Sequence, residues 1–107
     1  MNYRKVTAIF RLDLLGKVEK RLQELGVKGL TVSKVKGYGE YADFYAKDWL
    51  TTHARIELFL KEEEAEVTAQ AIMDAASLDM EGDGIVAILP VEKLYRIRTK
   101  TEVNHEE

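Results

Sequence analysis

The hydrophobic positions in the first quarter of the chain follow two different periods. Residues 5–12 alternate between two sets of side chains, which is typical of a β-strand. One set is Val6, Ala8 and Phe10, and the other is Thr7, Ile9 and Arg11. Residues 13–25 then change to helical spacing, with Asp13 at the expected N-cap and Gly26 at the expected C-cap. The apolar stripe of this helix is Leu15, Val18, Leu22 and Leu25.

The same kinds of pattern return along the rest of the chain. Residues 30–36 and 54–60 predict a second and a third strand. A second helix follows, entered through the acidic residues 62–64, which suit the positive end of a helix dipole. Its buried stripe is Ala65, Ala69, Ile72, Met73 and Ala76. Residues 84–90 predict a fourth strand that a proline ends, and residues 91–99 predict a fifth extended segment.

This element order predicts an α+β fold. Two strand-helix-strand halves joined by a loop are typical of the ferredoxin-like βαββαβ sandwich, here with an extra C-terminal strand. In that architecture both helices cover one face of an antiparallel sheet. The other face, which we expect to be apolar, then needs a partner, and this favours an oligomer. Residues 37–53 follow neither period and predict a long, aromatic-rich loop that is mobile without ligand.

Composition narrows the classes of function. The 107 residues predict a single domain, residues 1–107, and the absence of cysteine excludes disulfides and thiolate metal sites. A net charge of -3 gives no reason to expect nucleic-acid binding. No apolar run is long enough to insert into a membrane, and no signal peptide is recognisable, so we expect a cytoplasmic protein.

One short stretch combines a flexible turn with positive charge. Gly82 and Gly84 flank Asp83, and such a turn can present backbone N–H groups to an anion. Arg96 and Arg98 are two residues apart on the predicted last strand, so we expect them to project to the same face and to form a phosphate clamp. The alternative is an ordinary hairpin turn with two solvated arginines.

Residues 26–39 and 82–99, together with the element order, resemble the two signature segments of the PII signal-transduction proteins. The resemblance covers about residues 5–101 of the chain. It implies a homotrimer of ferredoxin-like subunits with adenine nucleotides in the clefts between them. It also implies a T-loop, here residues 37–53, that regulates a partner protein, often a membrane transporter, and a C-terminal tail, residues 100–107. PII proteins are regulators, so the resemblance implies no enzymatic activity.

The resemblance also implies a set of nucleotide-binding residues. Gly29 and Thr31 match the segment that reads the adenine edge, and Glu57 and Phe59 match the third-strand positions that line the adenine pocket. The positions implied to lie near the phosphates are Gly37, Gly39, Gly82, Asp83, Gly84, Arg96 and Arg98.

Two departures from the family pattern change the expected ligand. Glu40 and Tyr41 stand where the family has an Arg-Gln pair, whose glutamine helps to hold magnesium and 2-oxoglutarate. Ile85 stands where the family has a lysine that contacts the distal phosphates. We therefore expect ADP or AMP to bind in preference to ATP, without a metal and without 2-oxoglutarate. The loop is also several residues shorter than the usual T-loop.

Two other functions stay open at this point. One is a metal-binding or metal-tolerance trimer of similar fold, which would need His53 to converge with Asp43 or Asp48. The other is a purely structural trimer. Hydrolytic catalysis has no support, because no Ser-His-Asp, Cys-His or paired-carboxylate arrangement is recognisable in the sequence.

Overall fold

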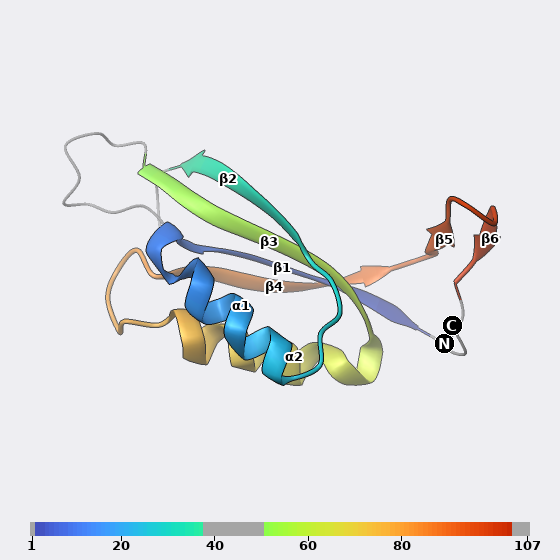
Figure 1. The fold of residues 1–107 in the computed structure, drawn as a ribbon, viewed down its shortest axis with the longest axis horizontal. Helices are drawn as coiled ribbons and strands as arrows, with labels where there is room; N and C mark the ends of the chain where they lie inside the picture. Colours follow the sequence, from blue (N-terminus) through green and yellow to red (C-terminus); the bar gives the residue numbers. More distant parts are fainter. Residues whose placement is uncertain (1, 38–50, 104–107) are drawn as a thin grey trace.

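The computed structural model describes residues 2–37 and 51–103 of the chain (Figure 1). Predictions about residues 38–50 and 104–107 lie outside the described residues; they include Gly39, Glu40, Tyr41, Asp43 and Asp48. The elements in chain order are β1 (Tyr3–Arg11), the 3-10 turn η1 (Leu12–Leu14), α1 (Leu15–Glu24), β2 (Thr31–Gly37), β3 (Thr51–Lys61), α2 (Glu62–Ala76), β4 (Gly84–Val91), β5 (Tyr95–Arg96) and β6 (Thr101–Glu102).

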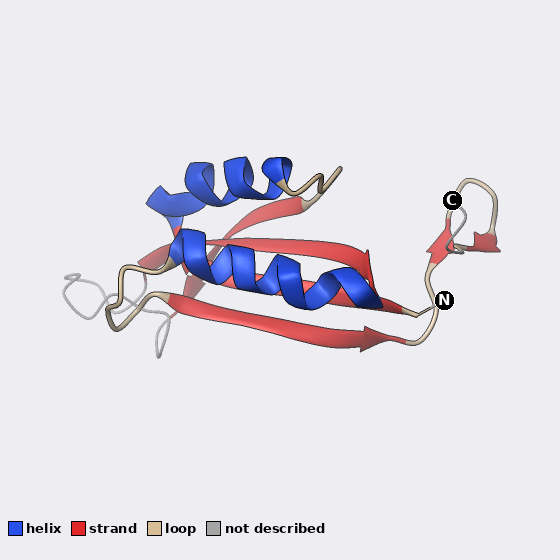
Figure 2. Ribbon diagram, turned by 90° about the horizontal axis from the view of Figure 1, so that it is seen from below, coloured by secondary structure: helices blue, strands red, loops and turns tan. Residues whose placement is uncertain are grey.

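Four strands form one antiparallel sheet in the order β2-β3-β1-β4. Both helices lie on the same face of this sheet, and within the described residues no helix covers the other face (Figure 2). The arrangement is the predicted ferredoxin-like βαββαβ sandwich. Because β1 is central, its two neighbours β3 and β4 bring segments from both halves of the chain into one surface.

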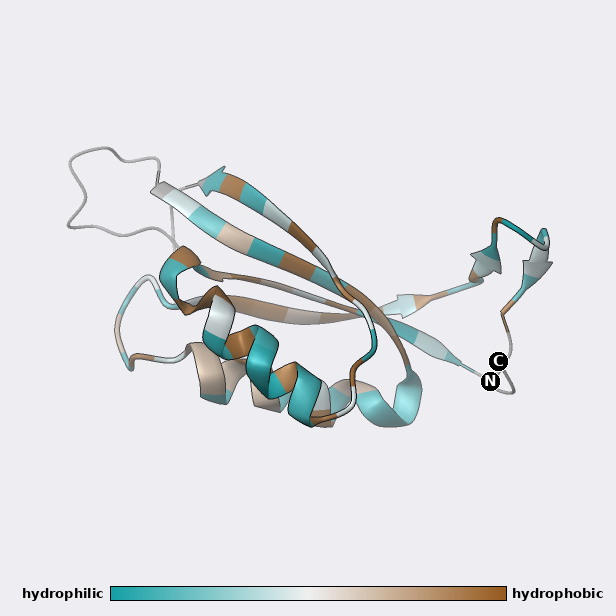
Figure 3. Ribbon diagram, viewed as in Figure 1, coloured by the Kyte–Doolittle hydropathy of each residue, from teal (hydrophilic) through white to brown (hydrophobic). Residues whose placement is uncertain are grey.

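The core lies between the sheet and the two helices. The alternation predicted for the first strand is confirmed, because Val6, Ala8 and Phe10 are all at most 2% exposed. The remaining strands and helices contribute Ala54, Ile56, Leu58, Val18, Leu22, Ala65, Ala69, Ile72, Ala75 and Ala76. Met73 was predicted in this stripe but is 43% exposed. Hydrophobic and hydrophilic residues alternate along α1 and β3 (Figure 3).

The first helix differs from the prediction at its start and agrees at its end. Asp13 lies inside η1, so it does not cap α1, which begins at Leu15 without a side-chain cap. The strand turns directly into a tight 3-10 turn, and this places Asp13 within the turn. At the other end Gly26 has φ +87°, and the N–H of Val27 donates to the carbonyl of Leu22 at 3.0 Å. This is a Schellman cap, the feature predicted for Gly26.

The predicted loop over residues 37–53 is wrong at both ends. Gly37 belongs to β2 and pairs with Thr51, and Val35 pairs with His53. The side-chain pattern of residues 51–53 is not alternating, but two threonines favour strand conformation and the backbone ladder extends through them. Gly37 and residues 51–53 therefore belong to the sheet.

The C-terminal segment is the largest departure from the prediction. Val91 still belongs to β4, so Pro90 does not end that strand as predicted, and residues 92–99 do not form a fifth strand of the main sheet. Residues 94–103, here called the arm, instead form a separate hairpin of β5 and β6, which projects from the body (Figures 1 and 2). The hairpin is closed by hydrogen bonds such as Val103 N–H to Leu94 O at 2.8 Å. The radius of gyration is 15.0 Å, against about 13 Å for a compact domain of this size, in keeping with a projecting arm.

Candidate functional site

The predicted site residues fall into two groups at opposite ends of the sheet. Residues 82–84, here called the turn, precede β4, and the arm follows it. Because β4 has eight residues, the two ends are separated by about 23 Å at the usual rise of a strand. Gly37, at the end of β2, lies at the same end of the sheet as the turn, since β4 begins opposite Phe10 and β2 ends beyond it.

The turn depends on its two glycines. Gly82 has φ +86° and Gly84 has φ +120°, a region that side chains rarely adopt. At Gly84 a Cβ atom would collide with the carbonyl oxygen of Ile9 and would lie 2.9 Å from the Cα of Phe10. Gly84 is therefore required where β4 first meets β1, whatever the turn binds.

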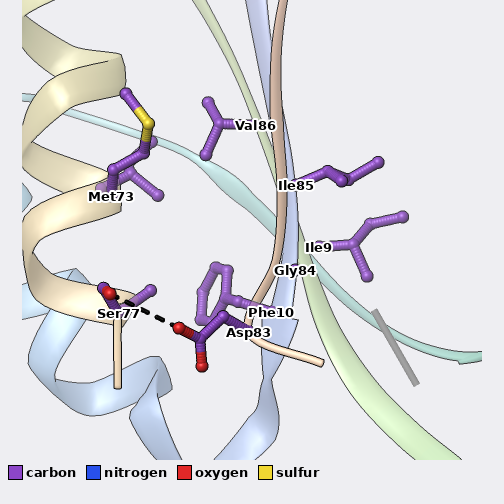
Figure 4. A pocket seen from close by; sticks show the side chains of 10 residues that line it. Ile9, Phe10, Met73, Ser77, Asp83, Gly84, Ile85 and Val86 are labelled. Carbon is purple, nitrogen blue, oxygen red and sulfur yellow. Dashed lines mark hydrogen bonds between the residues drawn. The ribbon is translucent and has the colours of Figure 1, made fainter. Parts of the chain in front are cut away.

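Asp83 directs its carboxylate into its own loop. Its Oδ2 accepts hydrogen bonds from the N–H of Leu78 at 3.0 Å and of Met80 at 3.2 Å, and from the Ser77 hydroxyl at 3.4 Å (Figure 4). Partial burial raises the pKa of this carboxyl, but these bonds and the Arg11 guanidinium outweigh burial and hold the pKa below its ordinary value of 3.8. The Asp83 side chain therefore supports the loop and is not available as a ligand.

The backbone of the turn is only partly open. The N–H of Asp83 donates to the carbonyl of Met80 at 3.3 Å, and Gly82 is buried. The N–H of Asp83 is therefore already used within the loop, and the expected presentation of N–H groups to an anion stays a prediction for Gly82 and Gly84.

A small cavity of about 250 Å³ lies beside the turn, between α2 and β4. Figure 4 shows Met73, Val86 and Phe10 on its inner side, while Ile9 and Ile85 project to the other side of the strands. No sequence pattern predicted this cavity, because it depends on the spacing between α2 and the start of β4.

At the other end a groove of about 810 Å³ lies between the body and the arm. Gly29, Phe59 and Arg96 all line this groove, so the fold brings three of the predicted residues together. Thr31 lies directly opposite Glu57 in the β2-β3 ladder, on the same face of the sheet as Phe59. Of the positions that the resemblance implies for adenine, Gly29 and Phe59 therefore line the groove, whereas Thr31 and Glu57 lie opposite each other outside its lining.

Glu57 has two basic neighbours that sequence reasoning missed. Its carboxylate lies 3.4 Å from Lys5 Nζ and 3.7 Å from Arg55 Nε, and Arg55 also donates to the Ser33 hydroxyl at 3.2 Å. The helix-free face was predicted to be apolar, but it carries a charged centre. Strand alternation could have indicated this, because Lys5, Arg55 and Glu57 all fall at outward positions.

Two arginines predicted to share a strand face do not do so. Arg96 lies in β5, but Arg98 lies in the turn that joins β5 to β6. Both side chains are exposed, and both stand at the far end of β4 from the turn. Within one chain they therefore cannot reach the turn, and the predicted clamp is not assembled there.

The described residues also bear on metal and membrane binding. Among residues 2–37 and 51–103, no group of three His, Asp or Glu side chains is arranged to hold a metal ion. His53 is buried, at 2% exposure, and its proposed partners Asp43 and Asp48 lie outside these residues. No helix in the same part of the chain has the length and hydrophobicity needed to span a bilayer.

Comparison with known proteins gives a consistent result. Residues 3–101 match the sequence model of a family described as nitrogen regulatory protein P-II. The nitrogen regulatory protein P-II of Cereibacter sphaeroides is 36% identical over 104 residues, which cover 90% of this chain and 92% of the relative. The nitrogen regulatory protein GlnK2 of Haloferax mediterranei is 37% identical, with 88% and 82% covered.

A solved structure has the same fold. The crystal structure of Arabidopsis thaliana PII bound to citrate superposes with a TM-score of 0.82 and 30% sequence identity, covering 99% of this chain and 92% of that chain. The family match, the relatives and the shared fold all extend over most of the chain. The chain therefore belongs to the nitrogen regulatory protein P-II family.

Proposed function

We propose that this PII-family regulator binds an adenine nucleotide, ADP or AMP more tightly than ATP, in clefts between the copies of a homotrimer. The bound nucleotide then determines how residues 37–53 engage a partner protein, which we expect to be a membrane transporter. The observation that carries the proposal is the separation of the two groups of site residues. One chain holds the turn and the arm about 23 Å apart, so a complete site needs two copies.

The arm supplies the link between copies. Ile97 is 92% exposed and Tyr95 is 56% exposed, on a hairpin that projects from the body. A large apolar side chain at the tip of such a hairpin favours contact with a second chain. A head-to-tail contact of this kind, in which the arm of one copy meets the turn end of the next, closes into a ring when the rotation fits, and three copies make the family's trimer.

The groove has the chemistry for adenine. Its volume of about 810 Å³ lies within the range of pockets for small ligands, about 300–1,000 Å³. Phe59 offers an apolar surface that is 51% exposed, and Thr31 and Glu57 offer polar groups on the same face. Arg96 at the edge of the groove and Arg98 beyond it would meet the phosphates.

The expected preference for fewer phosphates rests on Ile85. This residue replaces the lysine of the family motif directly after the turn, and its side chain is 42% exposed. Its ladder neighbour is Ile9, so an apolar pair borders the turn on the helix-free face. An apolar pair offers no charge to distal phosphates, and a charge-assisted hydrogen bond there is worth about 1.5–3 kcal/mol.

A regulatory role, rather than catalysis, is what the family affiliation supports. The Arabidopsis neighbour is described as bound to citrate, a small anion, which favours an effector-binding role for this fold. The partner and the loop that would contact it rest on the family resemblance.

The test is calorimetric titration of ADP, AMP and ATP into the wild type and into Arg96→Ala and Arg98→Ala. Each substitution should weaken ADP binding by about 1.5–3 kcal/mol, because each removes a charge-assisted contact to phosphate. Arg21→Ala is the matched control. Arg21 is an exposed arginine of α1 that lies 4.0 Å from Glu24 and lines neither the turn nor the groove.

Two results would contradict the proposal. Unchanged ADP affinity in both arm variants would remove Arg96 and Arg98 from the site. Strong Mg-ATP binding that 2-oxoglutarate tightens further would show that the replacements at Glu40, Tyr41 and Ile85 have been misinterpreted. Thermal stabilisation by divalent metals alone, without any response to nucleotide, would favour the metal-binding alternative.

A further inference from the structure

Residues 77–81, here called the connecting loop, join α2 to the turn, and the loop is organised around the Asp83 carboxylate. Two backbone N–H groups and the Ser77 hydroxyl donate to Oδ2. The connecting loop is otherwise exposed, with Leu78 47% and Met80 53% accessible. Its conformation therefore depends on these hydrogen bonds more than on apolar packing.

Arg11 ties this arrangement to the sheet. It is the last residue of β1, and its side chain is only 16% exposed. Its Nη2 donates to the carbonyl of Glu81 at 2.7 Å, and its Nε lies 3.4 Å from Asp83 Oδ1. One guanidinium thus contacts the residue before the turn and the middle residue of the turn, which a planar fork of donors does well.

The turn is also held by the hydrogen bonds to the Asp83 carboxylate and by the pairing of Gly84 with Phe10. Gly82 and Gly84 both have positive φ, so the backbone there has many accessible conformations when it is not held. The N–H of Asp83 reaches the carbonyl of Met80 at only 3.3 Å. The Arg11 side chain therefore adds a direct connection from Glu81 and Asp83 to the central strand β1.

We infer that Arg11 is a positioning residue for anion binding, which acts through Glu81 and Asp83 and does not itself contact the nucleotide. This inference rests on the proposed nucleotide site at the turn. With Arg11 in place, the amides of Gly82 and Gly84 are preorganised for phosphate. Without it, the connecting loop and the turn must be ordered by the ligand at the cost of affinity.

The test compares Arg11→Met, Arg11→Lys and the control Arg21→Met with the wild type. Hydrogen exchange of the Leu78 and Met80 amides is measured without ligand, and ADP affinity is measured by calorimetry. Arg11→Met should accelerate exchange of both amides and weaken ADP binding, each by about tenfold, the effect of losing one charge-assisted contact. Arg11→Lys keeps the positive charge but loses the two-point contact. Its amide exchange rates and its ADP affinity should therefore lie between those of Arg11→Met and those of the wild type. Arg21→Met should change neither.

A double-variant cycle separates positioning from direct contact. If Arg11 acts through Asp83, adding Arg11→Met to Asp83→Asn should weaken ADP binding by less than it does in the wild type.

Weaker ADP binding with unchanged exchange would show that Arg11 contacts the nucleotide directly and would overturn the inference. Faster exchange with unchanged affinity would overturn it too. A wild type that binds no adenine nucleotide would overturn the proposed function and the inference together, whereas equal binding by wild type and Arg11→Met would overturn the inference alone.

Discussion

Substitution by alanine should have opposite effects on stability at Gly84 and at Gly16. An alanine at Gly84 would collide with the backbone of Ile9 and Phe10 at a φ of +120°, so Gly84→Ala should destabilise the fold by about 2–4 kcal/mol. At Gly16, in α1, nothing lies within 4 Å of a new Cβ, so Gly16→Ala should stabilise by about 0.5–1 kcal/mol. Urea unfolding measures both, and equal effects at the two glycines would contradict the close approach of β4 to β1.

The contribution of Asp83 to the stability of the fold should decrease as the pH becomes acidic. Its folded-state pKa lies below the ordinary 3.8, so its stabilisation is complete above that value and is lost as pH falls through the folded pKa. At neutral pH, Asp83→Asn should lower the free energy of unfolding by about 1–2 kcal/mol. The difference from the wild type should shrink below pH 3.8. Urea unfolding at neutral and acid pH checks this, and a difference that stays constant would contradict it.

Single residues differ in how far the sequence could predict their role. Gly26 was predicted as a helix cap and Phe10 as a core residue because both roles depend on local spacing. The role of Asp83 depends on Arg11, which is 72 residues away in the chain and is brought near only because β4 pairs with β1. No local pattern carries that information, so the role of the Asp83 carboxylate in holding the loop was not predicted.

The strands of the sheet could be predicted from the alternation of apolar and polar residues, but the arm could not. Residues 91–99 have an extended pattern, and the sequence alone does not show whether they join the sheet or leave it. The outcome depends on a tight reversal, with φ +58° at Lys100 and a Lys100 N–H bond to Arg96 O at 2.8 Å. As a result, Arg96 and Arg98 were predicted near the turn within one chain, where the fold separates them.

The arm offers a test of contact between copies. Ile97 touches little within its own chain, so Ile97→Asp should change the stability of an isolated chain by less than about 0.5 kcal/mol. If the arm docks on a neighbour, the buried charge should instead dissociate the oligomer. Thr99→Asp, an exposed position in the same hairpin, adds the same charge and should leave the oligomer intact.

Light scattering measures the mass of the oligomer and so shows whether Ile97→Asp dissociates it. The wild type should have about three times the 12.2 kDa mass of one chain, and Ile97→Asp should have the mass of one. A wild-type monomer at micromolar concentration would exclude the trimer, and an intact Ile97→Asp trimer would exclude the arm as its essential contact.

In the whole molecule, we expect each nucleotide site to combine the turn of one copy with the arm of another. Two variants each disable one half of the proposed site. Ile85→Glu places a negative charge beside the turn. The pair Arg96→Ala with Arg98→Ala removes the proposed contacts of the arm to phosphate. Both changes are at exposed positions, so both variants should fold. Neither alone should bind ADP tightly.

The most direct measurement is ADP titration of the two variants after they are refolded together in equal amounts. In a randomly mixed ring of three, about one quarter of the sites pair an intact turn with an intact arm. This fraction of sites should bind ADP with wild-type affinity. A mixture that forms trimers and binds no more ADP than either variant alone would contradict it, because a site contained in one chain cannot be restored by mixing.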